Sequence, residues 1–151
     1  MKIKSIVLLI LVLIVSVSCV SSKSTLRNVD ENTPIPQLTA NNTFVITEFS
    51  KDPKYGYNPD YPINVFYKNT KDENINQQRY LNALTGPKGE KIFYKKMEVC
   101  CPFPTKNSEM GGGFLHVYEV TWVGLKEPVK LYLNIYEKGA LLVPIGFGLV
   151  K

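Results

Sequence analysis

The chain contains few of the side chains on which catalytic and metal-binding sites usually depend. It has a single histidine, His116, and only three cysteines in 151 residues. Structural zinc sites generally use four cysteine or histidine ligands at regular spacing, which these residues do not show. Residues 86–91, "GPKGEK", lack the spacing and the Ser/Thr of a phosphate-binding loop. The sequence therefore predicts no cofactor and indicates no catalytic residue.

A strong excess of charge of one sign is also absent. The formal net charge is +5, and no basic run is longer than Lys95-Lys96. Proteins that bind nucleic acid gather positive charge on one face, whereas dispersed lysines are typical of a solvated surface. We therefore expect no nucleic-acid partner.

No apolar run is long enough to cross a membrane as a helix. The run at residues 6–15 has ten residues, whereas a membrane-spanning helix takes about 20. Lys2 and Lys4 precede it, an arrangement typical of a secretory signal peptide. We expect residues 1–18 to be such a signal.

The end of this signal resembles the cleavage site of a bacterial lipoprotein. The small residue Ser18 stands before Cys19, and in such signals the cysteine receives a diacylglycerol and becomes the first mature residue. Such signals usually have an aliphatic residue three positions before the cysteine, whereas this chain has Ser16. We predict lipidation of Cys19, a membrane partner bound through this lipid, and a location in the cell envelope, with the outer membrane favoured. The alternative is an ordinary signal cut near Ser18, with Cys19 left as a thiol.

The mature chain is expected to divide into a tether and one domain. Residues 20–42 are rich in Ser, Thr, Asn and Pro and poor in large apolar side chains, which favours a flexible segment. We expect the lipidated cysteine and its tether over residues 19–43. A single globular domain is expected over residues 44–151, an ordinary length for one domain.

Apolar periodicity predicts an α+β domain that is dominated by strands, with a small antiparallel meander and one covering helix. The helix is expected over residues 71–87, capped by Asp72 or Thr70. Phe93, Met97 and Val99 are expected to share one side of their strand. Strands are expected over residues 44–49, 63–67, 91–99, 114–123 and 129–136, and a last extended edge segment over residues 140–147.

Residues 99–114 are the most unusual stretch, since two adjacent cysteines are followed by two prolines and a glycine triplet. With Cys19 lipidated, Cys100 and Cys101 are expected to form a vicinal disulfide or to remain buried thiols. If the flanking strands pair, His116 comes near them. A thiol or redox site at Cys100 and Cys101, or a metal site of Cys100, Cys101 and His116, are the alternatives that stay open.

Tyrosines gather in a turn-rich stretch, at Tyr55, Tyr57, Tyr61 and Tyr67. Aromatic rings on a loop can contact a ligand or a partner protein, so Tyr55, Tyr57 and Tyr61 are candidate contacts. The same rings and hydroxyl groups can instead fasten an irregular segment to the sheet, and this packing role is favoured.

Several phrases resemble a family of short lipoproteins from Bacteroidetes-type bacteria. They cover residues 52–65, 77–94, 100–136 and 144–147, and "CCPF", "GGG" and "YEVTW" are the most specific. The family implies no biochemical role, although its members are often named 2-dehydro-3-deoxyphosphooctonate aldolase. That enzyme is a (β/α)₈ barrel, which takes about 200 residues or more, so this chain is too short for it. We expect a non-enzymatic module that binds or stabilises an unknown envelope partner.

Overall fold

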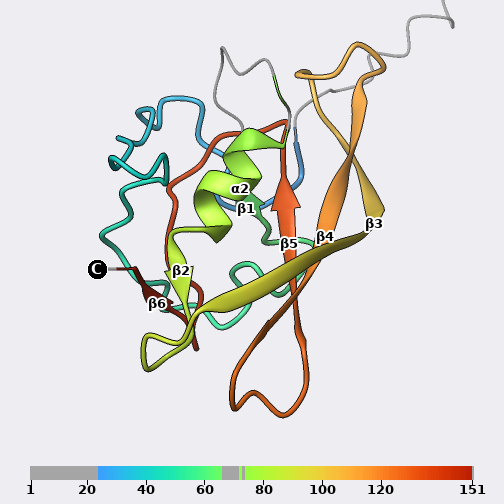
Figure 1. The fold of residues 1–151 in the computed structure, drawn as a ribbon. Helices are drawn as coiled ribbons and strands as arrows, with labels where there is room; N and C mark the ends of the chain where they lie inside the picture. Colours follow the sequence, from blue (N-terminus) through green and yellow to red (C-terminus); the bar gives the residue numbers. More distant parts are fainter. Residues whose placement is uncertain (1–23, 66–71, 73, 151) are drawn as a thin grey trace, which may run out of the picture.

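The computed structural model describes residues 24–65, 72 and 74–150, and it has the expected strand-dominated α+β fold (Figure 1). A single helix lies against one face of a twisted four-stranded sheet, and a two-stranded sheet lies beside it. The larger sheet has the order β1-β5-β4-β3 and the smaller one pairs β2 with β6. The elements are β1 (Ile63–Asn64), α2 (Ile75–Leu81), β2 (Leu84–Thr85), β3 (Ile92–Pro104), β4 (Gly112–Trp122), β5 (Val129–Asn134) and β6 (Gly148–Leu149).

The larger sheet is mixed rather than wholly antiparallel. The meander of β3, β4 and β5 has the predicted antiparallel pairing. The fourth strand, β1, runs parallel to β5, with Ile63 opposite Leu133 and Asn64 opposite Asn134. Parallel neighbours cannot be joined by a tight turn, so β1 reaches the sheet from a distant part of the chain. The expectation of a purely antiparallel sheet is therefore wrong at this edge.

β3 is longer than the expected strand and continues through both cysteines. Its pairing with β4 shifts register between Lys96 and Glu98 and again between Cys100 and Phe103. Because such bulges insert unpaired residues, they change which face later side chains occupy. Phe93 lies opposite Thr121 and Val99 opposite His116, on different faces of the sheet. The prediction that Phe93 and Val99 share one side is therefore wrong.

The helix is shorter than predicted and begins without a side-chain cap. Its N-cap residue is Asn74, whose N–H donates at 2.8 Å to the carboxylate of Asp72, two residues earlier. Thr70, the other expected cap, lies outside the described residues. The helix buries Tyr80 and Leu81 completely against the sheet, and the chain then turns directly into β2.

The main core lies between α2 and the face of the sheet that the helix covers. Burial of a large apolar side chain contributes about 1.5–3 kcal/mol, so this layer supplies most of the favourable free energy. A smaller group, formed by Phe103, Leu115 and Val117, is buried on the opposite face. The main core includes Phe44, Ile46, Tyr55, Ile63, Val65, Tyr80, Leu81, Leu84, Ile92, Tyr118, Val120, Leu131, Leu133, Val143 and Phe147.

The segment expected to be a tether is folded onto the domain from its first described residues. We call residues 24–43 the N-terminal strap. Its Arg27 N–H donates to the Asp60 carbonyl at 2.9 Å, and its Asp30 N–H donates to the Lys138 carbonyl at 2.8 Å. The buried Asn64 side chain donates to the carbonyls of Arg27 and Asn28. The structure thus corrects the boundary between tether and domain from residue 44 to about residue 26.

Two segments expected as strands are largely irregular. Residues 44–49 and 140–147 form isolated bridges in place of strands, in which Phe44 pairs with Leu38 and Phe49 pairs with Val143. Both segments are fastened by side chains and by a few backbone hydrogen bonds instead of by continuous ladders. Among residues 24–65, 72 and 74–150, no helix has the length and apolar character needed to span a membrane.

A Gly139→Ala substitution is expected to loosen the strap. A Cβ at this position would overlap the carbonyl oxygen of Asn28, so the strap and residue 139 have to separate. We expect urea denaturation to show a loss of about 1–3 kcal/mol in the free energy of unfolding. Hydrogen exchange at Asp30 should quicken in parallel.

Gly112→Ala is the matched control, because its added Cβ would meet only the Phe103 carbonyl oxygen at an ordinary 3.6 Å. It should change the free energy of unfolding by less than about 0.5 kcal/mol. Equal effects of the two substitutions, or unchanged exchange at Asp30 in the Gly139 variant, would contradict a docked strap.

Candidate functional site

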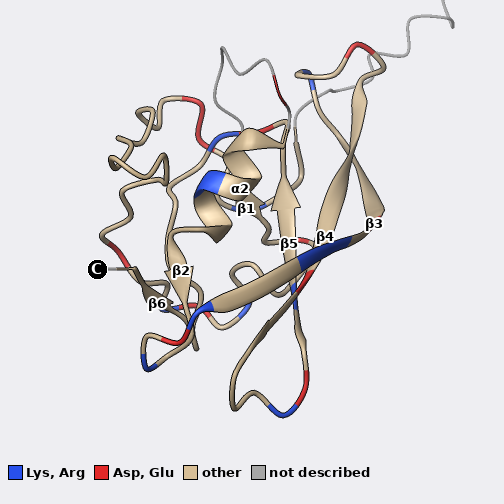
Figure 2. Ribbon diagram, in the orientation of Figure 1, with Lys and Arg blue, Asp and Glu red and all other residues tan. Residues whose placement is uncertain are grey.

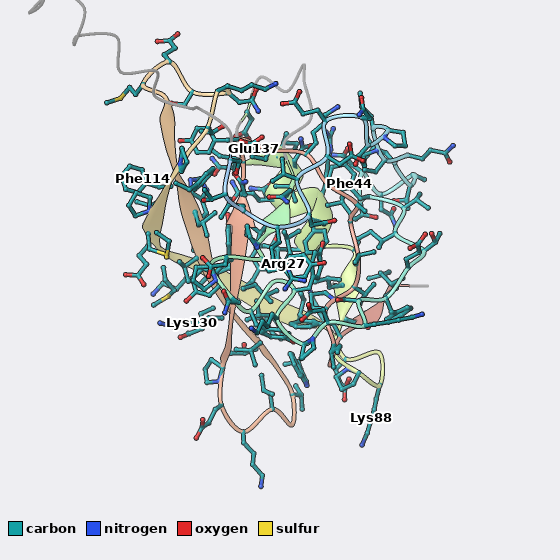
Figure 3. All side chains as sticks on the ribbon, turned by 180° about the vertical axis from the view of Figure 1, so that it is seen from behind. Arg27, Phe44, Lys88, Phe114, Lys130 and Glu137 are labelled. Carbon is teal, nitrogen blue, oxygen red and sulfur yellow. A yellow bond between two sulfur atoms is a disulfide. The ribbon has the colours of Figure 1, made fainter. Side chains whose placement is uncertain are left out.

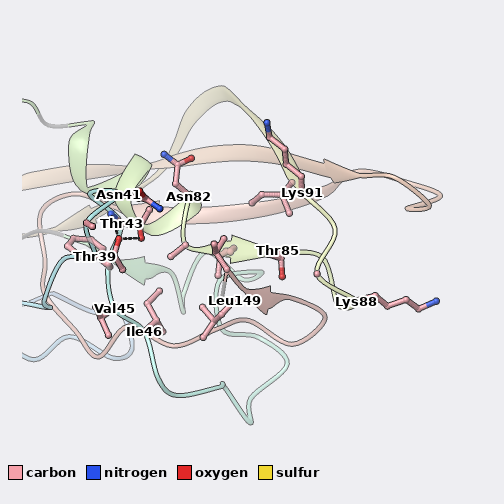
Figure 4. Close-up of a pocket in the computed structure, with 17 residues that line it drawn as sticks. Thr39, Asn41, Thr43, Val45, Ile46, Asn82, Thr85, Lys88, Lys91 and Leu149 are labelled. Carbon is pink, nitrogen blue, oxygen red and sulfur yellow. Dashed lines mark hydrogen bonds between the residues drawn. The ribbon is translucent and has the colours of Figure 1, made fainter.

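An open groove of about 1020 Å³ lies between the end of the strap and the smaller sheet (Figure 4). Binding sites for small molecules are concave and mostly apolar, with a few polar groups, and this groove has that character. It is lined by Thr39, Ala40, Asn41, Thr43, Phe44, Val45, Ile46, Asn82, Ala83, Leu84, Thr85, Lys88, Gly89, Lys91, Ile92, Leu149 and Val150.

One wall of the groove is a turn that is held rigidly to the helix. The Thr39 N–H donates to the Thr43 carbonyl at 2.9 Å, and the two threonine hydroxyls are 2.8 Å apart. Arg79 on α2 donates from Nε to the Asn42 side chain at 3.1 Å, and its carbonyl accepts the Phe44 N–H at 3.2 Å. The groove is therefore shaped before any ligand arrives.

The opposite wall is β2 and the tight turn that leads into β3. Gly89 has a φ of +89°, a left-handed conformation that glycine adopts without steric cost. The Glu90 carboxylate turns back to accept the Lys88 N–H at 2.8 Å. The Gly86 N–H donates to the Glu90 carbonyl at 2.8 Å, which closes the turn. This turn places Lys88 and Lys91 at the edge of the groove, and Figure 4 shows their side chains extending away from its interior.

The groove has a positive rim and an apolar interior. Lys88 and Lys91 are lining residues, and none of the lining residues is an aspartate or a glutamate. Figure 2 shows blue and red positions together on the turn between β2 and β3. The acidic residue of this turn is Glu90, whose carboxylate accepts the Lys88 N–H. Val45 is 43% exposed and Val150 is 55% exposed, so apolar surface inside the groove is open to a ligand.

The tryptophan of the chain lies directly behind the groove wall. A Cβ on Gly86 would be 3.0 Å from Cδ1 of Trp122, so the ring packs on the backbone beside Thr85. The same ring meets Phe147 edge-on at 5.2 Å between centroids. Since Trp122 is the one tryptophan in the sequence, its fluorescence reports on the state of this wall.

The two adjacent cysteines are bonded to each other. Cys100 and Cys101 form a vicinal disulfide with their Cα atoms 3.7 Å apart. They lie at the second bulge of β3, which is the outermost strand of the larger sheet, and Cys101 has a left-handed φ of +57°. The sequence left open whether these cysteines form a vicinal disulfide or remain buried thiols, and the structure contains the disulfide.

His116 does not join the cysteines in a site. In the register of β3 and β4, Cys100 lies opposite Leu115, so the imidazole of His116 projects from the other face. There it is buried and its Nδ1 lies 2.8 Å from Oε1 of Gln77 on the helix. Because an amide oxygen only accepts, Nδ1 is the donor in this bond. In the described part of the chain, no three His, Cys, Asp or Glu side chains gather as metal ligands.

The clustered tyrosines fasten irregular segments to the core. Tyr55 is fully buried, and its hydroxyl accepts the Leu142 N–H at 3.1 Å, which rules it out as a surface contact. Tyr57 donates to the Ile145 carbonyl at 2.5 Å, and Tyr61 lies beneath the Arg27 guanidinium, 4.2 Å from its ring centroid. None of the three lines the groove. Tyr67 lies outside the described residues.

Burial keeps the tyrosine hydroxyls protonated. Desolvation raises the pKa of Tyr57 and of Tyr118 to about 12, and it raises the pKa of Tyr80 well above its usual value. The Tyr80 hydroxyl can therefore donate to the Leu142 carbonyl, at 2.7 Å, over the whole physiological pH range. Through these bonds Tyr57 and Tyr80 hold the chain at residues 140–147.

A buried carboxylate that the sequence did not single out organises the loop after β3. Glu137 is 2% exposed, and its two oxygens accept hydrogen bonds from the Thr105 hydroxyl at 2.5 Å and the Asn107 amide at 2.9 Å. The partners lie about thirty positions away in sequence, and no local pattern links them. This carboxylate is satisfied by its neighbours, which is typical of a structural role.

The disulfide is expected to be visible by mass spectrometry of the protein in its native oxidation state. When thiols are blocked without a reductant, the tryptic peptide of residues 97–106 should carry no label and lack two hydrogens. After reduction the same peptide should carry two labels, because both sulfurs become thiols. Two labels before reduction would contradict the disulfide and reopen a thiol or metal site.

Comparison with protein-family models, with curated proteins and with solved structures gives no match to this chain. The fold, with its one described helix and mixed sheet, differs from the (β/α)₈ barrel of the aldolase whose name the resemblance carries. Evidence for the role of the protein therefore comes from its sequence pattern, its groove and its surface.

Proposed function

We propose that this protein is a lipid-anchored lipoprotein of the cell envelope, held on the outer membrane, and that its domain is a non-enzymatic binding module. The observation that carries the anchor is the apolar run at residues 6–15, which is followed, two residues later, by Ser18 and Cys19. Two or more acyl chains hold a protein on a membrane stably, without any spanning helix. The unknown envelope partner or ligand then meets a domain that stays at the membrane surface.

The groove supports the binding role and indicates the kind of ligand. Its interior offers Val45, Ile46 and Val150 for apolar contact, and Lys88 and Lys91 lie at its edge, where their long side chains can turn toward an acidic group of a ligand. A ligand with an apolar body and an acidic head would satisfy both features. The rigid walls mean that little conformational entropy is lost when such a ligand binds.

The arrangement of ionisable groups supports a role without catalysis. Glu137 is the one fully buried charged side chain among the described residues, and Thr105 and Asn107 occupy both of its oxygens. The groove lining contains no cysteine, histidine or carboxylate that would act as a nucleophile or general base. A catalytic site needs such groups in mutual reach, and the groove has none of these three types.

A second candidate function is thiol–disulfide exchange at Cys100 and Cys101. The observation that favours it is the position of this disulfide in the outermost strand, where both residues are partly exposed. An external thiolate can attack this accessible disulfide to give a mixed disulfide with one cysteine and a free thiolate on the other. A second external thiol then releases both cysteines as thiols, and the two external sulfurs leave as a disulfide. A change in the labelling of peptide 97–106 under envelope redox conditions distinguishes this function from a structural disulfide.

Intact mass spectrometry of detergent-extracted protein tests the anchor. We expect a mature chain that begins at Cys19 and carries acyl chains, after production in a bacterial host that processes lipoproteins. The control is Cys19→Ala, which removes the acceptor sulfur and should leave the chain unacylated. An unmodified N-terminus in the wild-type protein would disprove the anchor.

Titration with laurate tests the groove, with Trp122 fluorescence and calorimetry as readouts. Laurate has an apolar body and a carboxylate, whereas dodecanol of the same length has no charge. We expect laurate to bind more tightly than dodecanol. The double variant Lys88→Gln/Lys91→Gln should weaken laurate binding by about fivefold and leave dodecanol unchanged, because exposed charge contacts are each worth up to about 1 kcal/mol.

Lys51→Gln/Lys126→Gln is the matched control, since it removes the same charge at exposed positions outside the groove lining. This variant should bind laurate like the wild type. Equal weakening by both double variants would show a non-specific charge effect. The absence of any fluorescence change or heat with millimolar laurate would contradict the groove as a site for such ligands.

A further inference from the structure

The far end of the β3–β4 hairpin exposes several apolar side chains together. Met110 is 94% exposed, Val99 is 55% exposed and Phe114 is 50% exposed. A shallow depression of about 410 Å³ lies among Met110, Phe114 and the prolines Pro102 and Pro104, and its lining is apolar or glycine throughout. We call residues 102–114 the hairpin tip. Contiguous exposed apolar surface of this kind marks a contact site more often than chance does.

The tip has a defined shape, so its exposure does not reflect a loose loop. The Thr105 N–H donates to the Gly111 carbonyl and the Gly111 N–H donates to the Ser108 carbonyl, each at 3.0 Å. Below the loop, Glu137 accepts the hydrogen bonds of Thr105 and Asn107 described above. These contacts leave the Met110 side chain outside the hydrogen-bonded turn.

Packing beneath the tip turns Phe114 outward. A Cβ on Gly113 would be 2.7 Å from the ring of Tyr136, which shows that the ring occupies this side of the strand. Phe103 meets the same ring edge-on at 6.0 Å between centroids. Since side chains alternate along β4, Phe114 projects from the other side, away from the body of the domain (Figure 3).

The charges of the tip are few and one of them is paired. The Lys106 ammonium lies 2.9 Å from a carboxylate oxygen of Glu31 in the strap. This neighbouring carboxylate raises the pKa of Lys106, so the pair stays charged. Glu109 is exposed beside Met110, so its carboxylate can remain hydrated when the Met110 side chain leaves water. The tip is thus amphipathic, with apolar groups at its end and a salt bridge at its base.

The strap leads the chain toward the lipid from the same end of the molecule. Its Asp30 is bound to Lys138 and its Glu31 to Lys106, at the base of the hairpin tip. In Figure 1 the first described residues, in blue, begin beside the upper end of β5, on the side of the β3–β4 loop. The loop between β4 and β5 lies at the opposite end of the molecule.

Chain length decides which end of the domain can meet the membrane. Five peptide units join Cys19 to Ser24, and a fully extended chain of that length reaches at most about 18 Å. A compact domain of this size has a radius of gyration of about 14 Å and hence a diameter of about 36 Å. The lipid cannot therefore reach around to the β4–β5 end, and the end with the hairpin tip is the one held against the bilayer.

We propose that the hairpin tip inserts into the headgroup layer of the same membrane that carries the Cys19 lipid, with Met110 and Phe114 as the inserting side chains. This inference rests on the proposed lipid anchor. The acyl chains keep the tip next to the bilayer at high effective concentration, so shallow apolar contacts suffice to orient the domain. The groove, on the smaller sheet, then faces away from the membrane.

Methionine oxidation tests the orientation, because the reaction follows the exposure of the sulfur to water. The full acylated protein in phosphatidylcholine vesicles is compared with the Cys19→Ala protein free in solution, with dilute peroxide and peptide mass spectrometry. In solution Met110 should oxidise faster than Met97, which is 46% exposed on β3. On vesicles we expect the rate at Met110 to fall by at least about fivefold relative to the rate at Met97.

A reporter at the opposite end serves as the matched control. Val123 is 80% exposed at the end of β4, and Val123→Met adds a sulfur there without burying anything. Its oxidation rate should be the same on vesicles and in solution. Equal slowing at this position and at Met110 would overturn the proposal, since the vesicle would then shield the whole domain.

The remaining outcomes separate this inference from the proposed function. If the protein is acylated and floats with vesicles but Met110 oxidises as in solution, the inference fails and the anchor stands. If Cys19 carries no acyl chain, the mass shows that the proposed function fails, and the inference fails with it. If Met110 is already protected in solution and loses that protection on dilution, a second copy of the chain covers the tip and the membrane contact is overturned.

Discussion

The hydrogen-bonded carboxamides of Asn64 and Asn134 join three parts of the chain that are distant in sequence. Both side chains are completely buried, and the Asn134 amide donates to the Asn64 oxygen at 2.9 Å. Asn64 in turn donates to two carbonyls of the strap, and the Asn134 oxygen accepts the Tyr136 N–H. A buried carboxamide without partners costs about 1–3 kcal/mol, so strap, β1 and β5 are stable only together.

Much of the functional layout follows from this one junction. The strap enters over Asn64, continues past Glu31 at the base of the hairpin tip, and ends as a wall of the groove. The chain after Asn134 supplies Glu137, which holds the loop of the tip in shape. β2 and the turn into β3, which line the proposed ligand groove, lie at the other end of the ribbon from the β3–β4 loop, which is the proposed membrane contact (Figure 1). In this arrangement the proposed anchor would orient the domain and leave the groove accessible.

The predictions from sequence succeeded where the physical signal was local. Alternation in β3, β4 and β5 reflects which side chains face the core within one strand, and the pairing of neighbouring strands follows from short turns. A strand was expected at β1, but its parallel pairing was not, because two residues carry no periodic signal and their partner is about seventy positions away. The predictions also failed at the bulges of β3, since an inserted residue depends on how the partner strand packs.

The candidate site was still harder to anticipate. The groove is formed by an irregular segment, a tight turn and the end of the chain, none of which has a recognisable pattern. The adjacent cysteines and His116 attracted attention by their chemistry, yet Cys100 lies opposite Leu115, so that the neighbouring His116 projects from the other face. The low apolar content of the strap predicted a flexible segment, whereas backbone and carboxamide hydrogen bonds hold it in place.

By itself the sequence determined the strand-rich α+β class and the meander, because each depends on residues close together in the chain. Only the tertiary structure decided where the strap lies, whether Cys100 and Cys101 are bonded to each other, and which apolar side chains remain exposed. Those outcomes depend on contacts between distant segments, and a buried hydrogen bond or a covered face exists only when both partners have been brought together.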